Sequence, residues 1–181
     1  MNKIKYIYNK VTGKQTIVIV VIFLLFTSIV LPYIAGLTTR LIGVSESPDT
    51  GFGLTLNDLY FIRSEYGAYG RKVYIIMRYT FDIVWPIIYT SFLVVVFAYL
   101  GRNLNLKVGY KILYLPLIAV LFDFLENISA TIFMAKYPKQ ADFFGMMTLS
   151  SSMIKWGLIG LCFAGVIVLL VMYIIKKLRN K

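Results

Sequence analysis

The run LPLIAVLFDFLENISAT, residues 115–131, is apolar enough to cross a membrane, yet it carries Asp123, Glu126 and Asn127 near its middle. An ionisable side chain at the centre of a bilayer costs about 2.5–3.5 kcal/mol even on lenient insertion scales. Because three polar side chains occur within five residues, we expect them to find partners on neighbouring helices. The run therefore predicts a membrane-spanning helix that belongs to a bundle.

The composition of the whole chain agrees with a membrane protein. Of its 181 residues, 59% are hydrophobic and 15% are charged, and the mean hydropathy is +0.77. Lys and Arg outnumber Asp and Glu by 19 to 8, but the basic residues flank apolar runs, so membrane topology explains them better than a nucleic-acid partner does. The chain has no histidine, which excludes Ser/His and Cys/His nucleophiles, His-ligated zinc and His-ligated haem. We assign no metal site, and nothing in the sequence identifies a cofactor.

Four apolar segments are long enough to cross a hydrocarbon core of about 30 Å at 1.5 Å per residue. They predict an all-α fold, an integral membrane four-helix bundle that forms one domain over residues 1–181. The expected spans are at about 16–35, 73–100, 112–134 and 144–175. A cleaved signal peptide is the alternative for the first segment, although its apolar run is long for that role.

The polar segment 37–72 separates the first two spans. Thr55 and Asp58 resemble a capping box, and they precede apolar residues at helical spacing. We therefore predict a short amphipathic interfacial helix at about 56–66, ended by Gly67 and followed by a turn over residues 66–72. A solvated loop is the alternative.

The distribution of charge predicts the orientation. The N-terminal segment, the 101–111 loop and the C-terminal tail hold 11 Lys and Arg and no acidic residue, whereas the two opposite loops hold six basic and five acidic residues. The positive-inside rule makes the first side cytoplasmic. We therefore expect a protein of the plasma membrane with both termini in the cytoplasm and the 37–72 segment extracytoplasmic.

This orientation brings charges from three helices to one depth. At 1.5 Å per residue, Asp82, Asp123 and Lys155 lie roughly 14 Å below the outer edge of the hydrocarbon, and Glu126 lies roughly 9 Å below it. With Arg78, this layer holds two positive and three negative charges. A surplus charge is costly in a low dielectric, so we expect a bound cationic group or a proton, shared by Asp123 and Glu126.

The residues of this layer are the candidate site. If the site is catalytic, paired carboxyl groups would act as general acid and base, and these are Asp82, Asp123 and Glu126. Cationic and polar neighbours would bind a ligand, for example a phosphate, and these are Arg71, Arg78, Tyr89, Asn127 and Lys155.

A purely structural role is the alternative for the charges. Arg78 and Asp82 are spaced as an i, i+4 pair within one helix, and Lys155 could join Asp123 or Glu126 as an interhelical ion pair. Two prolines also lie beside the cluster, at positions 86 and 116. Each removes a backbone hydrogen bond, and the resulting kink could open a cavity.

Four motifs extend this interpretation. They are YGAYGRKVY (66–74), FDIVWPIIY (81–89), LPLIAVLFDFLEN (115–127) and SSMIKW (151–156). Together they resemble the pattern YGxxGRxxY, DxxxPxxY, PxxAxxxDxxEN and a late KW of an uncharacterised group of small four-span bacterial membrane proteins. The resemblance covers about residues 66–156 and implies a common polar site without naming its chemistry.

The sequence leaves three functions open. The polar layer could bind or modify a lipid headgroup or small amphiphile beneath the amphipathic segment, which leaves open whether the protein is an enzyme. It could carry a proton or cation in transport, for which four helices are few and a homo-oligomer would be needed. It could also be the structural network of a non-catalytic assembly or immunity-type subunit. In each case the lipid bilayer is the first expected partner.

Overall fold

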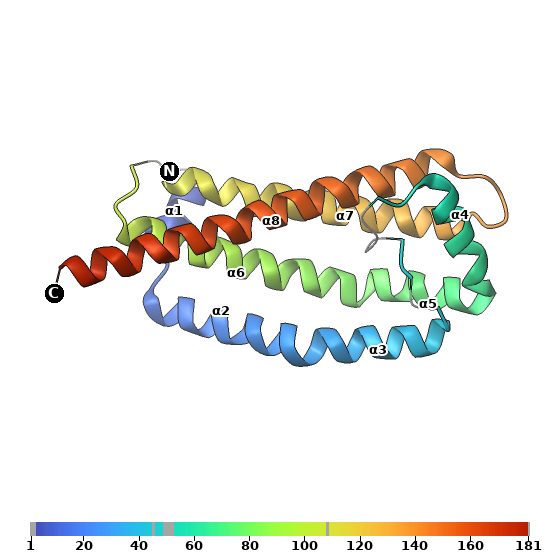
Figure 1. The fold of residues 1–181 in the computed structure, drawn as a ribbon, viewed down its shortest axis with the longest axis horizontal. Coiled ribbons are helices and arrows are strands. Elements are labelled where there is room, and N and C mark those ends of the chain that lie inside the picture. The colour runs from blue at the N-terminus through green and yellow to red at the C-terminus, as the bar shows by residue number, and fades with distance from the viewer. Residues whose placement is uncertain (1–2, 45, 49–52, 108, 181) are drawn as a thin grey trace.

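The computed structural model describes residues 3–44, 46–48, 53–107 and 109–180. Across these ranges the fold is all-α, and it contains four helical stretches that are long and apolar enough to span a membrane, namely Gly13–Ile42, Gly67–Asn103, Gly109–Ala135 and Asp142–Arg179. Figure 1 shows an elongated bundle with the two termini at one end, here called the termini end, and helix α4 at the other, the α4 end. The predicted all-α four-helix bundle is therefore confirmed.

The first stretch consists of α2 (Gly13–Leu25), a π-helical segment η1 (Phe26–Val30) and α3 (Leu31–Ile42). It is longer at both ends than the expected span 16–35. Thr12 and Gln15 form a capping box that starts α2, and Gly43 ends α3 in the left-handed conformation at φ 79°. The π segment ends two residues before Pro32, a residue that cannot donate a backbone hydrogen bond.

Helix α4 (Leu56–Glu65) confirms the helix predicted at about 56–66. The Thr55 N–H donates to Asp58 Oδ2 at 2.7 Å, and the Asp58 N–H donates to Thr55 Oγ1 at 3.3 Å. The Thr55 hydroxyl also donates to Asp58 Oδ2, at 2.7 Å, and this bond and the one from the Thr55 N–H lower the pKa of the Asp58 carboxyl group. Gly67, at φ 57°, turns the chain after α4, but the turn predicted over 66–72 is wrong, because helix α5 begins at Gly67 itself.

The second stretch is broken where one continuous helix was expected. Helix α5 (Gly67–Tyr79) and helix α6 (Phe81–Asn103) meet at Thr80, whose φ of −117° and ψ of −81° are not helical. The Thr80 hydroxyl donates to the carbonyl of Ile76 at 2.9 Å. This side chain therefore pairs with a backbone acceptor near the end of α5.

The last two stretches form an antiparallel pair. They are the 3-10 segment η2 (Gly109–Leu113) with α7 (Tyr114–Ala135), and α8 (Asp142–Arg179). Pro116 is the third residue of α7, within the first turn, where proline is well tolerated because the first N–H groups of a helix have no partner inside it. Helix α8 has 38 residues and is roughly 57 Å long at 1.5 Å per residue, which exceeds a bilayer core.

A short helix at the N-terminus, α1 (Lys3–Lys10), was not predicted from its basic sequence. Arg102 at the end of α6 donates to the backbone carbonyls of Asn9 and Val11, and so satisfies one acceptor in the last turn of α1 and one just beyond it. The ring of Tyr8 packs close to Gly101, where a side chain larger than hydrogen would meet the ring atoms. Contacts distant in sequence therefore hold α1 against the termini end.

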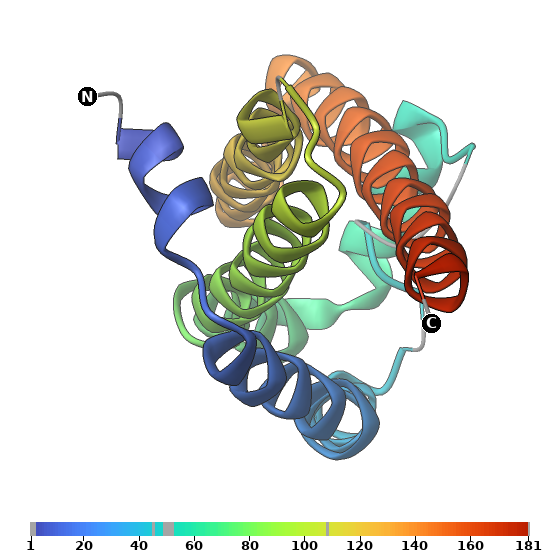
Figure 2. The same ribbon diagram turned by 90° about the vertical axis from the view of Figure 1, so that its left-hand side faces the viewer.

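Helix α6 occupies the middle of the bundle. It contacts α2, α7 and α8, while α7 and α8 pack along one another and α3 packs against α5. Tyr89, Leu93 and Phe97 of α6, spaced four residues apart, are buried in the main core. The end-on view in Figure 2 shows α2 and α3 along one edge of the bundle, opposite α7.

Candidate functional site

The site is built around the break between α5 and α6. Arg78 lies in the last turn of α5 and Asp82 in the first turn of α6, the positions at which a cation and an anion favourably face the two helix dipoles. Arg78 Nη1 is 3.2 Å from Asp82 Oδ2, which confirms that these two residues pair. The side chain of Arg78 is 5% exposed and that of Asp82 is 23% exposed. Asp82 is thus the part of this pair that reaches the surface.

Pro86, four residues after Asp82, leaves a backbone carbonyl of α6 without its helical donor, and a side chain of α7 supplies one. Pro86 has no N–H to donate to the carbonyl of Asp82, four residues earlier. Instead, Asn127 Nδ2 donates to that carbonyl at 2.9 Å, and Asn127 Oδ1 accepts from Arg78 Nη1 at 2.9 Å. The Asn127 amide therefore bridges the backbone of α6 and the guanidinium of α5, and a buried backbone acceptor stays paired.

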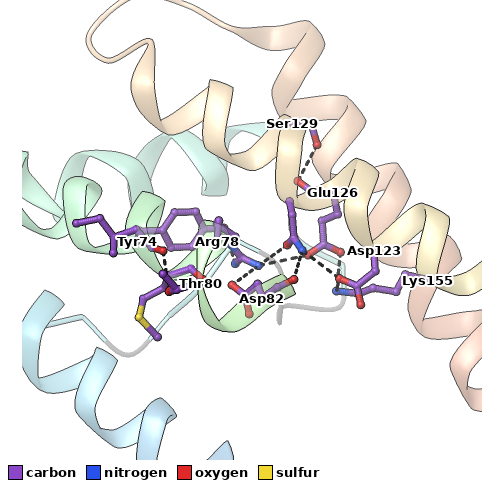
Figure 3. Close-up of polar contacts among 11 residues, drawn as sticks. Tyr74, Arg78, Thr80, Asp82, Asp123, Glu126, Ser129 and Lys155 are labelled. Atoms are coloured by element: carbon purple, nitrogen blue, oxygen red, sulfur yellow. Dashed lines mark hydrogen bonds and ion pairs between the residues drawn. The ribbon is translucent and has the colours of Figure 1, made fainter. Parts of the chain in front are cut away.

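Arg78 has further contacts within the bundle. Its Nη2 donates to the hydroxyl of Tyr74 at 2.6 Å, and its guanidinium lies 4.4 Å from the centre of the Tyr74 ring. Glu126 Oε1 lies 4.0 Å from Nη1, at the limit of an ion pair. Figure 3 shows Arg78 between Tyr74 on one side and the carboxylates on the other.

The second half of the network joins α7 to α8. Lys155 Nζ is 2.8 Å from Glu126 Oε2 and 3.7 Å from Asp123 Oδ1. The side chains of Asp123 and Glu126 are 6% and 0% exposed, so both ion pairs are buried. Tyr89 of α6 donates to Asp123 Oδ2 at 2.9 Å, and Lys155 Nζ lies 5.1 Å from the centre of the Trp156 ring. Figure 3 shows Asp123 and Glu126 from α7 both facing Lys155.

Seven of the eight predicted site residues come together in this network, which spans α5, α6, α7 and α8. The eighth, Arg71, lies elsewhere, at the α4 end of the bundle. Its Nη1 donates to the carbonyl of Arg63 at 3.1 Å, and its guanidinium stacks 3.7 Å from the centre of the Tyr137 ring. These contacts tie α5 to α4 and to the connection before α8.

Three further residues extend the network and were not predicted as site residues. Tyr74 could have been found from its position four residues before Arg78 on the same helix. Ser129 and Thr148 join α7 to α8, since the Thr148 hydroxyl donates to Ser129 Oγ at 3.0 Å and the Ser129 hydroxyl to the carbonyl of Glu126 at 3.0 Å. Small hydroxyl residues are common in membrane helices, so their sequence carries no comparable signal.

Two pockets border the network, and Arg78 lines both of them. The first, here called the α3–α5 pocket, has a volume of about 230 Å³ and lies between α3 and α5, with Arg78 and Asp82 in its wall. The rest of its wall is mainly apolar and aromatic, with the hydroxyl residues Thr38, Thr39 and Ser47. The second has a volume of about 270 Å³ and exposes Arg78 and Asn127 among apolar residues of α5, α6 and α7. Neither lining includes Asp123, Glu126 or Lys155.

The charges of the network do not balance if all groups are ionised. Arg78 and Lys155 carry two positive charges, against three negative charges on Asp82, Asp123 and Glu126. Among the residues that the structure describes, no group of three or more His, Cys, Asp or Glu side chains is placed to hold a metal ion.

Comparison with known proteins gives no relative. No protein-family model, curated protein or solved structure matches the chain. The resemblance to the group of four-span bacterial membrane proteins therefore stays a prediction.

Proposed function

We propose that this membrane protein binds the polar headgroup of a lipid or other amphiphile in the α3–α5 pocket. The observation that carries the proposal is the pocket itself, since it places the charged pair Arg78–Asp82 in a wall that is otherwise mainly apolar and aromatic. Ligand sites generally combine an apolar lining with a few polar groups that fix orientation.

The size of the pocket supports a headgroup as the bound part. Its volume of about 230 Å³ is below the range of about 300–1,000 Å³ that is typical of sites for whole small molecules. An amphiphile could place its headgroup beside Asp82 and leave its alkyl chains in the surrounding bilayer. Lipid would reach the pocket sideways, because α3 lies along one edge of the bundle (Figure 2).

The charge distribution supports an outer-leaflet ligand. The basic residues without acidic neighbours gather in the N-terminal segment, the 101–111 loop and the C-terminal tail, all at the termini end. We propose that this end is cytoplasmic and that α4 is extracytoplasmic. The α3–α5 pocket then lies in the outer half of the membrane.

The buried half of the network supports a second candidate, a non-catalytic subunit whose charges hold the bundle together. Asp123 and Glu126 are buried and are paired with Lys155. A catalytic role for these two carboxyl groups requires a route from the pocket that the present arrangement does not contain, since neither lines it.

Filling the pocket tests the proposal. Ile34 lines the α3–α5 pocket, and the Ile34→Trp variant should lower the amount of phospholipid that remains bound to the detergent-purified protein, measured by native mass spectrometry. Leu25 is 54% exposed on the same helical stretch outside the pocket, so Leu25→Trp is the matched control. Equal lipid retention by wild type and both variants would contradict binding in this pocket.

A further inference from the structure

We propose that the α3–α5 pocket selects a headgroup that carries an ammonium group and binds that group beside the carboxylate of Asp82. The inference rests on the proposed function and adds the chemical class of the ligand. Three observations carry it, namely the charge balance of the network, the exposure of its acids and the residues that surround Asp82.

The charge balance calls for one more cation. With two basic and three acidic side chains, the ionised network carries one surplus negative charge. An uncompensated charge among apolar helices is costly, because the low dielectric neither screens nor solvates it. A ligand ammonium would neutralise the surplus, whereas a ligand anion without a cationic group would double it.

Exposure singles out Asp82 as the acid that a ligand can meet. Asp123 and Glu126 are 6% and 0% exposed and face Lys155 inside the bundle. Asp82 is 23% exposed and lines the α3–α5 pocket. A cation that enters this pocket therefore approaches the most exposed carboxylate of the network.

The surroundings of Asp82 suit an ammonium better than a free phosphate. Tyr66, Tyr74 and Phe81 contribute aromatic side chains to the same pocket lining as Asp82. Aromatic rings attract cations, as the ring of Tyr74 does with the guanidinium of Arg78 at 4.4 Å. Arg78, the basic residue of this lining, already donates to Tyr74 and to Asn127 and pairs with Asp82. Its guanidinium is held by protein groups on several sides, and its side chain is 5% exposed, whereas that of Asp82 is 23% exposed.

An amine could come from a lipid headgroup or from a small soluble amine, and the experiment distinguishes them. The detergent-solubilised protein is equilibrated with equal amounts of phosphatidylethanolamine and phosphatidylglycerol that carry the same acyl chains, and retained lipid is counted by native mass spectrometry. A parallel sample receives ethanolamine alone. We expect phosphatidylethanolamine to be retained about tenfold over phosphatidylglycerol, the ratio typical of one charge-assisted interaction. Competition by ethanolamine would assign recognition to the soluble amine, and its absence would assign it to the lipid.

Asp82→Asn should abolish the preference, whereas Asp82→Glu, which keeps the charge, should retain part of it. Glu65 is exposed on α4, and Glu65→Gln is the control for loss of one acidic charge outside the pocket. Equal retention of the two lipids, or preference for phosphatidylglycerol, by wild-type protein would overturn the inference even if Asp82→Asn fails to fold. Failure of the proposed function has a different signature, namely lipid retention that Ile34→Trp leaves unchanged.

Discussion

At the scale of single residues, the spacing of Asp82, Pro86 and Asn127 has a simple physical explanation. A proline four residues after Asp82 leaves the Asp82 carbonyl without its helical donor, and Asn127 on the next spanning helix supplies one at 2.9 Å. In a membrane, no water reaches an unpaired carbonyl. A proline inside a spanning helix is therefore tolerated where another group donates to the carbonyl that it leaves unpaired. The same amide accepts from Arg78, so one side chain satisfies both partners.

This explanation predicts the outcome of a double-mutant cycle. Asn127→Ala should lower the free energy of unfolding by about 1–3 kcal/mol, because it leaves buried polar groups unpaired. Pro86→Ala restores an N–H for the Asp82 carbonyl, so Pro86→Ala/Asn127→Ala should cost less than Asn127→Ala alone. Unfolding of each purified variant in mixed detergent measures the four stabilities.

Asn103→Ala is the control for the cycle, since Asn103 donates to the carbonyl of Tyr99 on its own helix near the termini end. It should show no coupling to Pro86→Ala. Strict additivity of the Pro86 and Asn127 changes would mean that the carbonyl of Asp82 is not the link between them.

At the scale of helices, the buried ion pairs join α7 to α8 at a fixed register. Lys155 is the only basic residue between Lys139 and Lys176 in the sequence, and it meets Glu126 at 2.8 Å. Hydroxyl contacts through Ser129 and Thr148 continue the same interface toward the α4 end. A helix slide would separate these partners within the apolar interior, so the network opposes it.

Removing the cation from this interface should therefore be costly. Lys155→Met leaves two carboxylates facing one another and should lower stability by about 3–5 kcal/mol, the usual cost of breaking a buried pair. Glu126→Gln/Lys155→Met removes both partners and should cost less than Lys155→Met. The unfolding midpoint in detergent measures both, with the exposed Lys139→Met as control.

The double variant also bears on function. If Glu126→Gln/Lys155→Met folds and still retains lipid, the Glu126–Lys155 pair has a structural role. If it folds and loses lipid while Ile34→Trp has no effect, the ligand is bound at the buried half of the network and not in the α3–α5 pocket.

At the scale of the whole molecule, orientation decides which leaflet supplies the ligand. A cysteine placed at exposed Glu65 in a Cys162→Ala background should react with a membrane-impermeant maleimide on intact cells. A cysteine at exposed Lys177 near the other end should react only after the membrane is permeabilised. The reverse pattern would place the α3–α5 pocket in the cytoplasmic half of the bilayer and contradict the proposed topology.

Much of the architecture follows from hydropathy and cap residues. An apolar run that is long enough to cross a bilayer as a helix is compatible with few structures other than a spanning helix. In lipid, the backbone must satisfy its own hydrogen bonds. Thr55 and Asp58 marked the start of α4 correctly, since a capping box is a local interaction. Because charged side chains are costly in hydrocarbon, the sequence also predicted contacts among five of them, namely Arg78, Asp82, Asp123, Glu126 and Lys155.

Other features depend on contacts between segments that are distant in sequence, and local sequence patterns do not reveal such contacts. Neither glycine nor proline stands at the break at Thr80 to mark it in the sequence, and it is the fold that turns Arg78 toward Tyr74 and Asn127. The burial of Asp123 and Glu126, against the partial exposure of Asp82, depends on how α8 covers α7. Hydropathy and helical rise set the depth of a charge in the membrane, but packing around the helix axis sets which partner it faces and whether a ligand can reach it.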